Sequence, residues 1–270
     1  MKFGISIANF GVSVRPQDYA RLAREAEEVG WDGFFLWDHV HFGRGNSNLD
    51  PWIVLAAIAC NTESIRIGTH ITPLPRRRPQ KVAREAVSLD YLSDGRMILG
   101  VGLGEPSKTE FAVFGEPTDL KVRAKMLDES LEIITCLWSG KPCNYEGVYR
   151  KAMGVRFEPQ PLQKPRIPIW VGGRWPKKGA FKRAARFDGV TPIGVGNPSR
   201  FQAMMEYVNR HRKNKGKFDW ICYNPYLSKP KRNQVASEYK DIGATWYLES
   251  WGALPLDRQL KRLARGPPDI

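Results

Sequence analysis

The chain alternates compact apolar segments with amphipathic ones along its whole length, and this alternation predicts strands and helices in turn. Between residues 18 and 29, apolar side chains recur at the spacing of one helix face: Tyr19, Leu22, Ala23, Ala26 and Val29. Runs such as Phe34-Phe35-Leu36-Trp37 are short and uniformly apolar, which is typical of strands buried on both faces. The predicted strands cover residues 2–8, 34–37, 65–71, 97–102, 167–171, 189–193, 220–223 and 244–248. The predicted helices cover residues 18–29, 50–60, 80–92, 122–138, 179–186, 198–212, 234–241 and 256–263.

Glycines mark the junctions at which a predicted helix gives way to the next strand. Four junctions share this feature: Gly30-Trp31-Asp32-Gly33, Ser93-Asp94-Gly95, Phe187-Asp188-Gly189 and Ile242-Gly243-Ala244. A glycine just past a helix end adopts the left-handed conformation that turns the chain back toward the sheet. We therefore predict a left-handed glycine at each junction.

Eight strands, each followed by a helical pattern, imply an α/β fold with a parallel sheet covered on its outer face. The sheet can close into a (β/α)₈ TIM barrel or stay open and doubly wound. We favour the closed barrel, because the strand count is eight and no glycine-rich dinucleotide turn follows the first strand. We expect a loop insertion after the fourth strand, over residues 104–121, and a hairpin over 145–158. The sequence shows no disordered linker, low-complexity segment or domain boundary, so residues 1–270 are predicted to form a single domain.

Composition is that of an ordinary soluble protein, with 42% hydrophobic and 26% charged residues. No apolar run approaches the roughly 20 residues needed to cross a bilayer, so no membrane association is expected. The N-terminal segment is interpreted as the first strand and not as a secretory signal. The four cysteines are far apart and form no CxxC pair. We interpret Cys60 and Cys136 as buried thiols, which suits a reducing cytoplasm, and we expect a cytoplasmic protein.

The formal net charge of +14 raises the question of a nucleic-acid partner. The lysines and arginines are dispersed, however, and no DNA- or RNA-reading motif accompanies them. We interpret the charge as solvated surface with some attraction for an anionic small molecule, and expect no nucleic-acid partner.

In a closed barrel, chemistry lies where strands end and loops begin, at the carboxyl ends of the strands. Asp38 and His39 follow the second strand, where they could form hydrogen bonds or move a proton. The alternative is that Asp38 caps the turn and His39 is a satisfied loop histidine. His41 is a weaker candidate. His39 and His41 also form the His-x-His pattern of metal-dependent hydrolases, but the chain has too few further histidines to complete such a site.

Later strand ends supply further candidates. Arg76-Arg77-Arg78, set among prolines, either meets an anionic ligand or decorates a rigid loop. Gly104 allows close backbone approach to a flat ring, and Glu105 is expected at the mouth as an acid, a base or a hydrogen-bond partner, unless it only pairs with a nearby arginine. Gly172-Gly173-Arg174 precedes a helix with lysines nearby, which suits a phosphate.

These segments together resemble the bacterial-luciferase-like family (luciferase-like monooxygenases), which includes enzymes dependent on the deazaflavin F420. The resemblance covers nearly the whole chain and is carried by five stretches, residues 30–39, 65–79, 92–104, 168–173 and 243–249. It implies a cofactor, FMN or F420, lying across the barrel mouth. It also implies a homodimer and a non-proline cis peptide at His70, Ile71 or Thr72.

The site that the resemblance implies can be named residue by residue. The cofactor-binding residues would be Asp38, Thr69, His70, Ile71, Thr72, Gly104, Gly172, Gly173 and Arg174. The catalytic residues would be His39, moving a proton or stabilising negative charge, and Glu105, acting as an acid provided that it is buried. The arginine run suits the acidic tail of F420, but the same run occurs among relatives that use either cofactor.

We therefore expect an oxidoreductase that carries out hydride transfer or monooxygenation on a small organic substrate. Alternatives are a non-catalytic flavin-binding barrel, a metal-dependent hydrolase and a nucleic-acid binder.

Overall fold

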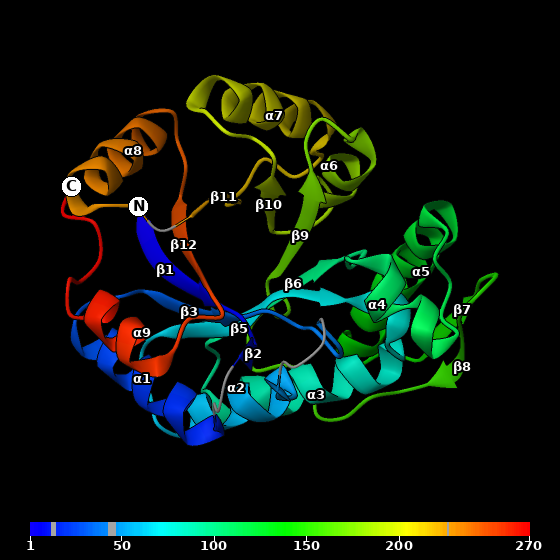
Figure 1. The fold of residues 1–270 in the computed structure, drawn as a ribbon. Coiled ribbons are helices and arrows are strands. Elements are labelled where there is room, and N and C mark those ends of the chain that lie inside the picture. The colour runs from blue at the N-terminus through cyan, green and yellow to red at the C-terminus, as the bar shows by residue number, and fades with distance from the viewer. Residues whose placement is uncertain (12–14, 43–46, 226) are drawn as a thin grey trace.

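The computed structural model describes residues 1–11, 15–42, 47–225 and 227–270, and within these ranges eight strands close into a barrel (Figure 1). Around the barrel the strands follow the order β1 (Lys2–Ile7), β12 (Trp246–Gly252), β11 (Asp219–Pro225), β10 (Gly189–Ile193), β9 (Ile169–Arg174), β6 (Met97–Gly102), β5 (Arg66–Pro73) and β3 (Gly33–Leu36). Neighbouring strands are parallel, including β1 with β12, which closes the ring. The predicted (β/α)₈ barrel is confirmed.

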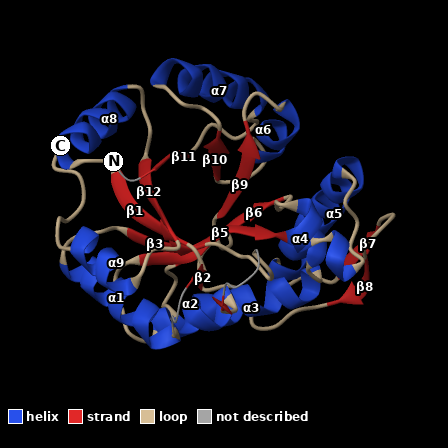
Figure 2. Ribbon diagram, in the orientation of Figure 1, coloured by secondary structure: helices blue, strands red, loops and turns tan. Residues whose placement is uncertain are grey.

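Helices surround the strands on the outside (Figure 2). The helices between successive strands, and the last one after β12, are α1 (Pro16–Glu28), α2 (Pro51–Ala59), α3 (Pro79–Leu92), α5 (Leu120–Trp138), α6 (Lys178–Ala184), α7 (Pro198–His211), α8 (Lys229–Asp241) and α9 (Leu256–Leu263). Asp50 caps α2, since its carboxylate accepts hydrogen bonds from the amides of Trp52 and Ile53 at 2.9 and 3.1 Å. In the part of the chain that the structure describes, no helix is both long and apolar enough to cross a bilayer.

The expected excursions from the barrel are present. The insertion after β6, the fourth barrel strand, contains the short helix α4 (Ser107–Glu110) and the 3₁₀ turn η2 (Ala112–Phe114). The hairpin consists of β7 (Cys143–Glu146) and β8 (Lys151–Val155), which pair antiparallel and lie outside the barrel beside α5 (Figure 1). A two-residue pairing of β2 (Phe10–Gly11) with β4 (Ser47–Asn48) and the 3₁₀ turn η1 (Leu74–Arg76) complete the described elements.

Large apolar side chains fill part of the barrel interior: Phe35, Ile98, Trp170, Ile221, Trp246 and Leu248. Gly33 leaves the space for these rings, because a Cβ at Gly33 would stand 2.6 Å from the Phe35 ring and 2.9 Å from Trp246. This packing makes the interior a solid core and not a pore, so a ligand can enter only from the rim.

A β-bulge interrupts β5 close to its carboxyl end. Thr69 pairs with Leu99 on β6, whereas Thr72 pairs with Val101, so three steps along β5 oppose two steps along β6. The peptide bond between His70 and Ile71, inside this bulge, is cis. The prediction of a non-proline cis peptide at this point is confirmed.

The junction glycines follow the prediction at three of the four sites. Gly30, Gly95 and Gly243 have φ of +90°, +75° and +93°. Gly189 does not adopt this conformation and instead begins β10. A Cβ there would lie 2.5 Å from the Trp170 ring, so the glycine serves close packing and not a turn.

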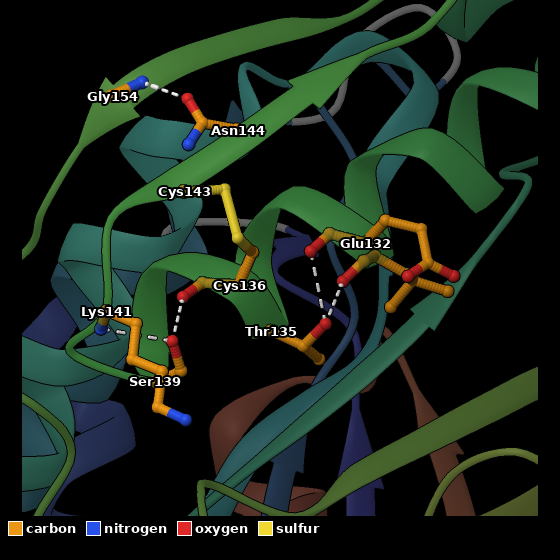
Figure 3. The surroundings of a disulfide bond; sticks show 9 residues. Glu132, Thr135, Cys136, Ser139, Lys141, Cys143, Asn144 and Gly154 are labelled. Carbon is orange, nitrogen blue, oxygen red and sulfur yellow. Dashed lines mark hydrogen bonds between the residues drawn. A yellow bond between two sulfur atoms is a disulfide. The ribbon is translucent and has the colours of Figure 1, made fainter.

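The cysteine predictions are wrong. Cys60 is exposed, and Cys136 forms a disulfide with Cys143 (Figure 3). The turn after α5, in which the Ser139 hydroxyl donates to the Cys136 carbonyl at 2.6 Å, folds the chain back so that β7 starts beside the helix end. The spacing of seven residues hid this proximity. Disulfides are rare in cytosolic proteins, so the cysteines no longer favour a reducing compartment.

We predict that Gly68→Ala is strongly destabilising, because a Cβ at Gly68 would stand 1.9 Å from the carbonyl oxygen of Ile98 on β6. Backbone must move to relieve this contact, and the expected loss is about 2–3 kcal/mol of unfolding free energy in urea titrations. Gly179→Ala is the matched control, since a Cβ at Gly179 meets nothing within 4 Å. Equal urea midpoints for the two variants would contradict the packing argument.

Candidate active site at the barrel mouth

A cavity of about 520 Å³ opens at the carboxyl ends of the strands. The carboxyl-terminal parts of β5, β9 and β10 and the segments after β3 and β6 contribute its walls: Trp37 to His39, His70, Ile71, Pro73, Leu103 to Glu105, Gly172 to Arg174, Thr191 and Ile193. Helices α5 and α6 and strand β11 complete the walls with Leu120, Ala124, Gly179, Ala180, Arg183 and Tyr223, and Lys177 precedes α6. The structure thus brings His39, Glu105, Gly172 and Gly173 to one hollow, as the closed barrel requires.

Asp38 belongs to the cavity wall, and its side chain is buried in a network of hydrogen bonds and ion pairs. Its carboxylate accepts from the Thr72 hydroxyl at 2.8 Å and from the guanidinium groups of Arg76 and Arg77 at 2.8 and 2.9 Å. Arg76 also donates to the Asp38 carbonyl at 2.6 Å. Arg76 and Arg77 therefore point inward and bind a carboxylate of the protein itself. Neither sequence interpretation, a direct contact with an anionic ligand or a surface role on a rigid loop, describes these two residues.

Glu110, on α4, is the second buried carboxylate of this network. It accepts from His39 Nδ1 at 3.1 Å, from the amides of Val40 and His41 at 3.0 and 3.1 Å, and from Arg76 Nη1 at 2.8 Å. Burial alone would raise the pKa of Glu110, but the hydrogen bonds from His39 and Val40 and the charge of Arg76 outweigh it and hold the pKa below the ordinary value. Glu110 is therefore ionised at neutral pH beside the histidine.

This contact determines which nitrogen of His39 can serve the cavity. With Nδ1 directed at a carboxylate, the neutral imidazole carries its proton on Nδ1 and leaves Nε2 as the acceptor. The backbone of His39 is held as well, since Asn9 accepts from its amide at 3.0 Å and donates to its carbonyl at 2.8 Å. The backbone and the ring of His39 are thus both held in place at the cavity wall.

Glu105 lies at the mouth of the cavity, but 64% of its side chain is exposed. It pairs with Arg123 Nη2 at 3.3 Å. This is the arrangement expected from the sequence as the alternative to a role in catalysis, a carboxylate that only pairs with a nearby arginine. Arg123 is itself buried and donates to the carbonyl of Gly104 at 2.8 Å. The acid role was expected to depend on burial, and the structure does not provide that burial.

Ile71 forms an apolar wall of the cavity where the bulge projects its side chain. A Cβ at Gly102 would stand 2.0 Å from Ile71 Cδ1, and one at Gly172 would stand 2.8 Å from the same atom. These glycines therefore make room for the Ile71 side chain. Gly104 has φ of +80° and packs against Pro73, which explains why glycine is needed there.

Cations gather on the side of the cavity formed by β9 and α6. Arg174 and Lys177 line it and are exposed, and Gly173 packs against Ala180 of α6. Arg183 also lines it, but its guanidinium is engaged by Asp128 of α5 at 2.6 and 2.8 Å. An anionic group entering the cavity would therefore meet Arg174 and Lys177 first.

Polar side chains form the floor of the cavity above the apolar core. His70 lies between Ser6 Oγ, 3.1 Å from Nδ1, and Thr191 Oγ1, 2.6 Å from Nε2, and its ring meets Tyr223 edge to face. Burial lowers the pKa of His70 to about 4, so the imidazole is neutral at physiological pH. Thr69 and Thr72 are buried and do not line the cavity. The Thr69 hydroxyl donates to the Gly100 carbonyl, and the Thr72 hydroxyl donates to Asp38.

The β7–β8 hairpin is tied to the loop that carries the two inward arginines. Glu129 of α5, fully buried, accepts from the amides of Val148, Tyr149 and Arg150 at 2.8–2.9 Å. Arg150 then donates to the carbonyls of Pro75 and Arg77 at 2.8 and 3.3 Å. The turn of the hairpin therefore supports the loop from outside.

Sequence reasoning missed several of these residues. Glu110 belongs to the connection after β6, where the sequence shows no periodicity, and a Glu three residues after a Ser in a loop is no specific signal. Thr191 is the single polar residue of the apolar strand β10, and that interruption is a signal that could have found it. Tyr223 precedes Asn224 near the end of β11, where the sequence gives no such signal. Among the residues that the structure describes, no cluster of three or more His, Cys, Asp or Glu side chains could hold a metal ion.

We predict that Arg76→Met severely destabilises the protein. The substitution leaves Asp38 and Glu110 buried with their shared counter-charge removed, for which a loss of about 3–5 kcal/mol is expected. Arg78→Met is the control, because Arg78 is exposed. Urea unfolding followed by circular dichroism measures both variants, and a loss below about 1 kcal/mol for Arg76→Met would show that the network is not energetically important.

Comparison with known proteins gives the chain its family context. The family model described as luciferase-like monooxygenase matches residues 1–264. An F420-dependent glucose-6-phosphate dehydrogenase of Amycolatopsis mediterranei (strain U-32) is 35% identical over 185 residues, which cover 67% of this chain and 55% of that protein. The chain thus spans about half the length of this curated relative.

Two solved structures show the same fold. An F420-dependent secondary alcohol dehydrogenase in complex with an F420-acetone adduct has a TM-score of 0.79 at 20% identity, with 96% of each chain covered. The oxygenating constituent of 3,6-diketocamphane monooxygenase from Pseudomonas putida, in complex with FMN, has a TM-score of 0.68 at 20% identity, with 88% of this chain and 71% of that chain covered. Because the family model extends over nearly the whole chain, this protein belongs to the luciferase-like monooxygenase family.

Proposed function

We propose that this protein is an oxidoreductase that binds F420 or FMN at the barrel mouth and acts on a small organic substrate by hydride transfer or monooxygenation. The observation that carries the proposal is the oriented His39, held by the buried Glu110 at the edge of a cavity that is otherwise largely apolar. Its volume of about 520 Å³ lies within the roughly 300–1,000 Å³ typical of small-molecule sites.

The residues present fit a flat ring with an anionic tail. Ile71 and Leu103 offer apolar surface. Gly179 lines the cavity, and because a Cβ there meets nothing within 4 Å, its missing side chain leaves open space. Arg174 and Lys177 supply positive charge beside Gly172 and Gly173, where a phosphate is expected to bind.

We assign the roles of binding residues accordingly. His70, Ile71 and Gly104 would contact the ring, and Gly172, Gly173 and Arg174 would hold the tail. Asp38 would act mainly by fixing the loop of His39. Thr69 and Thr72 would act through the Gly100 carbonyl and Asp38, since neither lines the cavity.

When bound, either cofactor supplies a centre that accepts or donates two electrons. The chain's own residues position the substrate, exclude water and move a proton at His39 Nε2. The relative at 35% identity favours F420, and the cations at Arg174 and Lys177 suit its acidic tail. FMN is the alternative, supported by the FMN complex of the same fold.

A homodimer and a cytoplasmic location stay predictions that the family resemblance supplies. Light scattering after gel filtration measures the first. Cell fractionation measures the second.

We expect purified protein to bind F420 or FMN in a fluorescence titration, and His39→Ala to retain that affinity while turnover falls by about 10²–10⁴-fold, the usual contribution of an acid–base group. His41→Ala is the matched control, because the His41 side chain is exposed and its amide, not its ring, contacts Glu110. Cofactor binding without turnover on any reductant would instead support a non-catalytic flavin-binding barrel. Binding of neither cofactor would contradict the proposal.

The two glutamates near the mouth are expected to differ. Glu110→Gln removes the charge that orients His39, so turnover should fall by about tenfold or more at unchanged cofactor affinity. Glu105→Gln should have a smaller effect, since this exposed carboxylate pairs with Arg123. Measurement of kcat and KM for the two variants checks which substitution lowers turnover more. A larger loss of turnover in Glu105→Gln than in Glu110→Gln would support Glu105 as the acid.

A further inference from the structure

A row of hydrogen-bonded side chains crosses the barrel interior directly below the cavity. Trp37 Nε1 lies 3.0 Å from Ser6 Oγ, Ser6 Oγ lies 3.1 Å from His70 Nδ1, and His70 Nε2 lies 2.6 Å from Thr191 Oγ1. The row begins after β3, passes through β1 and β5, and ends on β10 across the barrel. Trp37, His70 and Thr191 line the cavity.

The chemistry of the first member suggests a direction for the whole row. An indole N–H can only donate, so Ser6 Oγ accepts from Trp37. The single hydrogen of Ser6 is then available to His70 Nδ1, which accepts it in this order. A neutral imidazole has one donor and one acceptor, so His70 Nε2 carries the proton and donates to Thr191 Oγ1. Thr191 accepts this bond, and its own hydroxyl hydrogen is left for another acceptor.

The surroundings of His70 support the neutral state on which this order depends. Its ring nitrogens face two hydroxyls, and its ring faces Tyr223 and Phe35. The Tyr223 hydroxyl donates to Ser250 Oγ at 2.8 Å and also interacts with Ser6, so it is the one other acceptor identified for the Ser6 hydrogen among the described residues. The low pKa that burial gives His70 agrees with a single ring proton.

The opposite order is the competing arrangement. If Ser6 directed its hydrogen to the Tyr223 hydroxyl, His70 Nδ1–H would donate to Ser6, and Thr191 would donate to Nε2. Thr191 would then offer the cavity no hydrogen. The two orders differ in the tautomer of His70, which can be measured.

We propose that Trp37, Ser6 and His70 form a directional hydrogen-bond chain that leaves the hydroxyl hydrogen of Thr191 free for the cavity, where it donates to an acceptor atom of the bound ring. The acceptor is a carbonyl oxygen or an unprotonated ring nitrogen. The proposal rests on the proposed function for the identity of the ligand, but not for the direction of the chain. Thr191 would thus be a binding residue that the family resemblance did not name.

The direction is tested without any cofactor. The chain holds four histidines, so long-range ¹H–¹⁵N spectra can be assigned with single-histidine variants. We expect His70 as the neutral tautomer with its proton on Nε2 throughout the neutral pH range, and a shift of this balance in Ser6→Ala. A proton on Nδ1, or on both nitrogens, would overturn the proposal.

The donor role is tested by affinity. Thr191→Val removes the hydroxyl at nearly constant volume and should weaken binding of F420 or FMN by about threefold to tenfold, as expected for one hydrogen bond, with a shift in the absorption maximum of the bound ring. Thr191→Ser should restore both. Thr135→Val is the matched control, because Thr135 is a half-buried threonine of α5 whose hydroxyl donates to the Leu131 carbonyl at 2.8 Å and which does not line the cavity.

The outcomes separate this proposal from the proposed function. If wild-type protein binds and Thr191→Val binds equally well with an unshifted spectrum, the donor role is overturned while the proposed function stands. If wild-type protein binds neither cofactor, the proposed function fails, and the His70 tautomer alone decides the direction of the chain.

Discussion

The arrangement of the site depends on one electrostatic constraint, which is that two buried carboxylates share a single guanidinium. Arg76 bonds Asp38 with one nitrogen and Glu110 with the other, both at 2.8 Å. Two anions removed from water are tolerated only with such a counter-charge and with further donors, here Thr72, Arg77 and the amides of Val40 and His41. The orientation of His39 follows from this balance, because Glu110 remains an anion that its ring can donate to.

The bulge in β5 is the second determinant of the cavity. In a regular strand, successive side chains point to opposite faces, so His70 and Ile71 could not both contribute to one surface. The extra residue changes this alternation, and both side chains line the cavity. The apolar wall and the polar floor thus come from neighbouring residues of one strand.

Much of the fold could be predicted from the sequence, because helix and strand periodicities are strong in a chain whose core lies between a closed sheet and its helices. The position of the site at the strand ends followed from that closure. The contacts inside the site could not be predicted in the same way. A run of three arginines between prolines is compatible with a surface loop and with a buried network, and the positions of the two carboxylates of Asp38 and Glu110 decide between them. The Cys136–Cys143 pair was missed because a tight turn, and not a spacing motif, brings the two residues together.

The link between the hairpin and the arginine loop limits how this scaffold can be recombined. Arg150 reaches the carbonyls of Pro75 and Arg77, although about 75 residues separate them along the chain. The hairpin is therefore not an independent module that can be grafted between homologues. A chimera that exchanges residues 143–155 without their partner loop would lose the hydrogen bonds that support the cavity wall from outside, so recombination breakpoints need to keep both segments from the same parent.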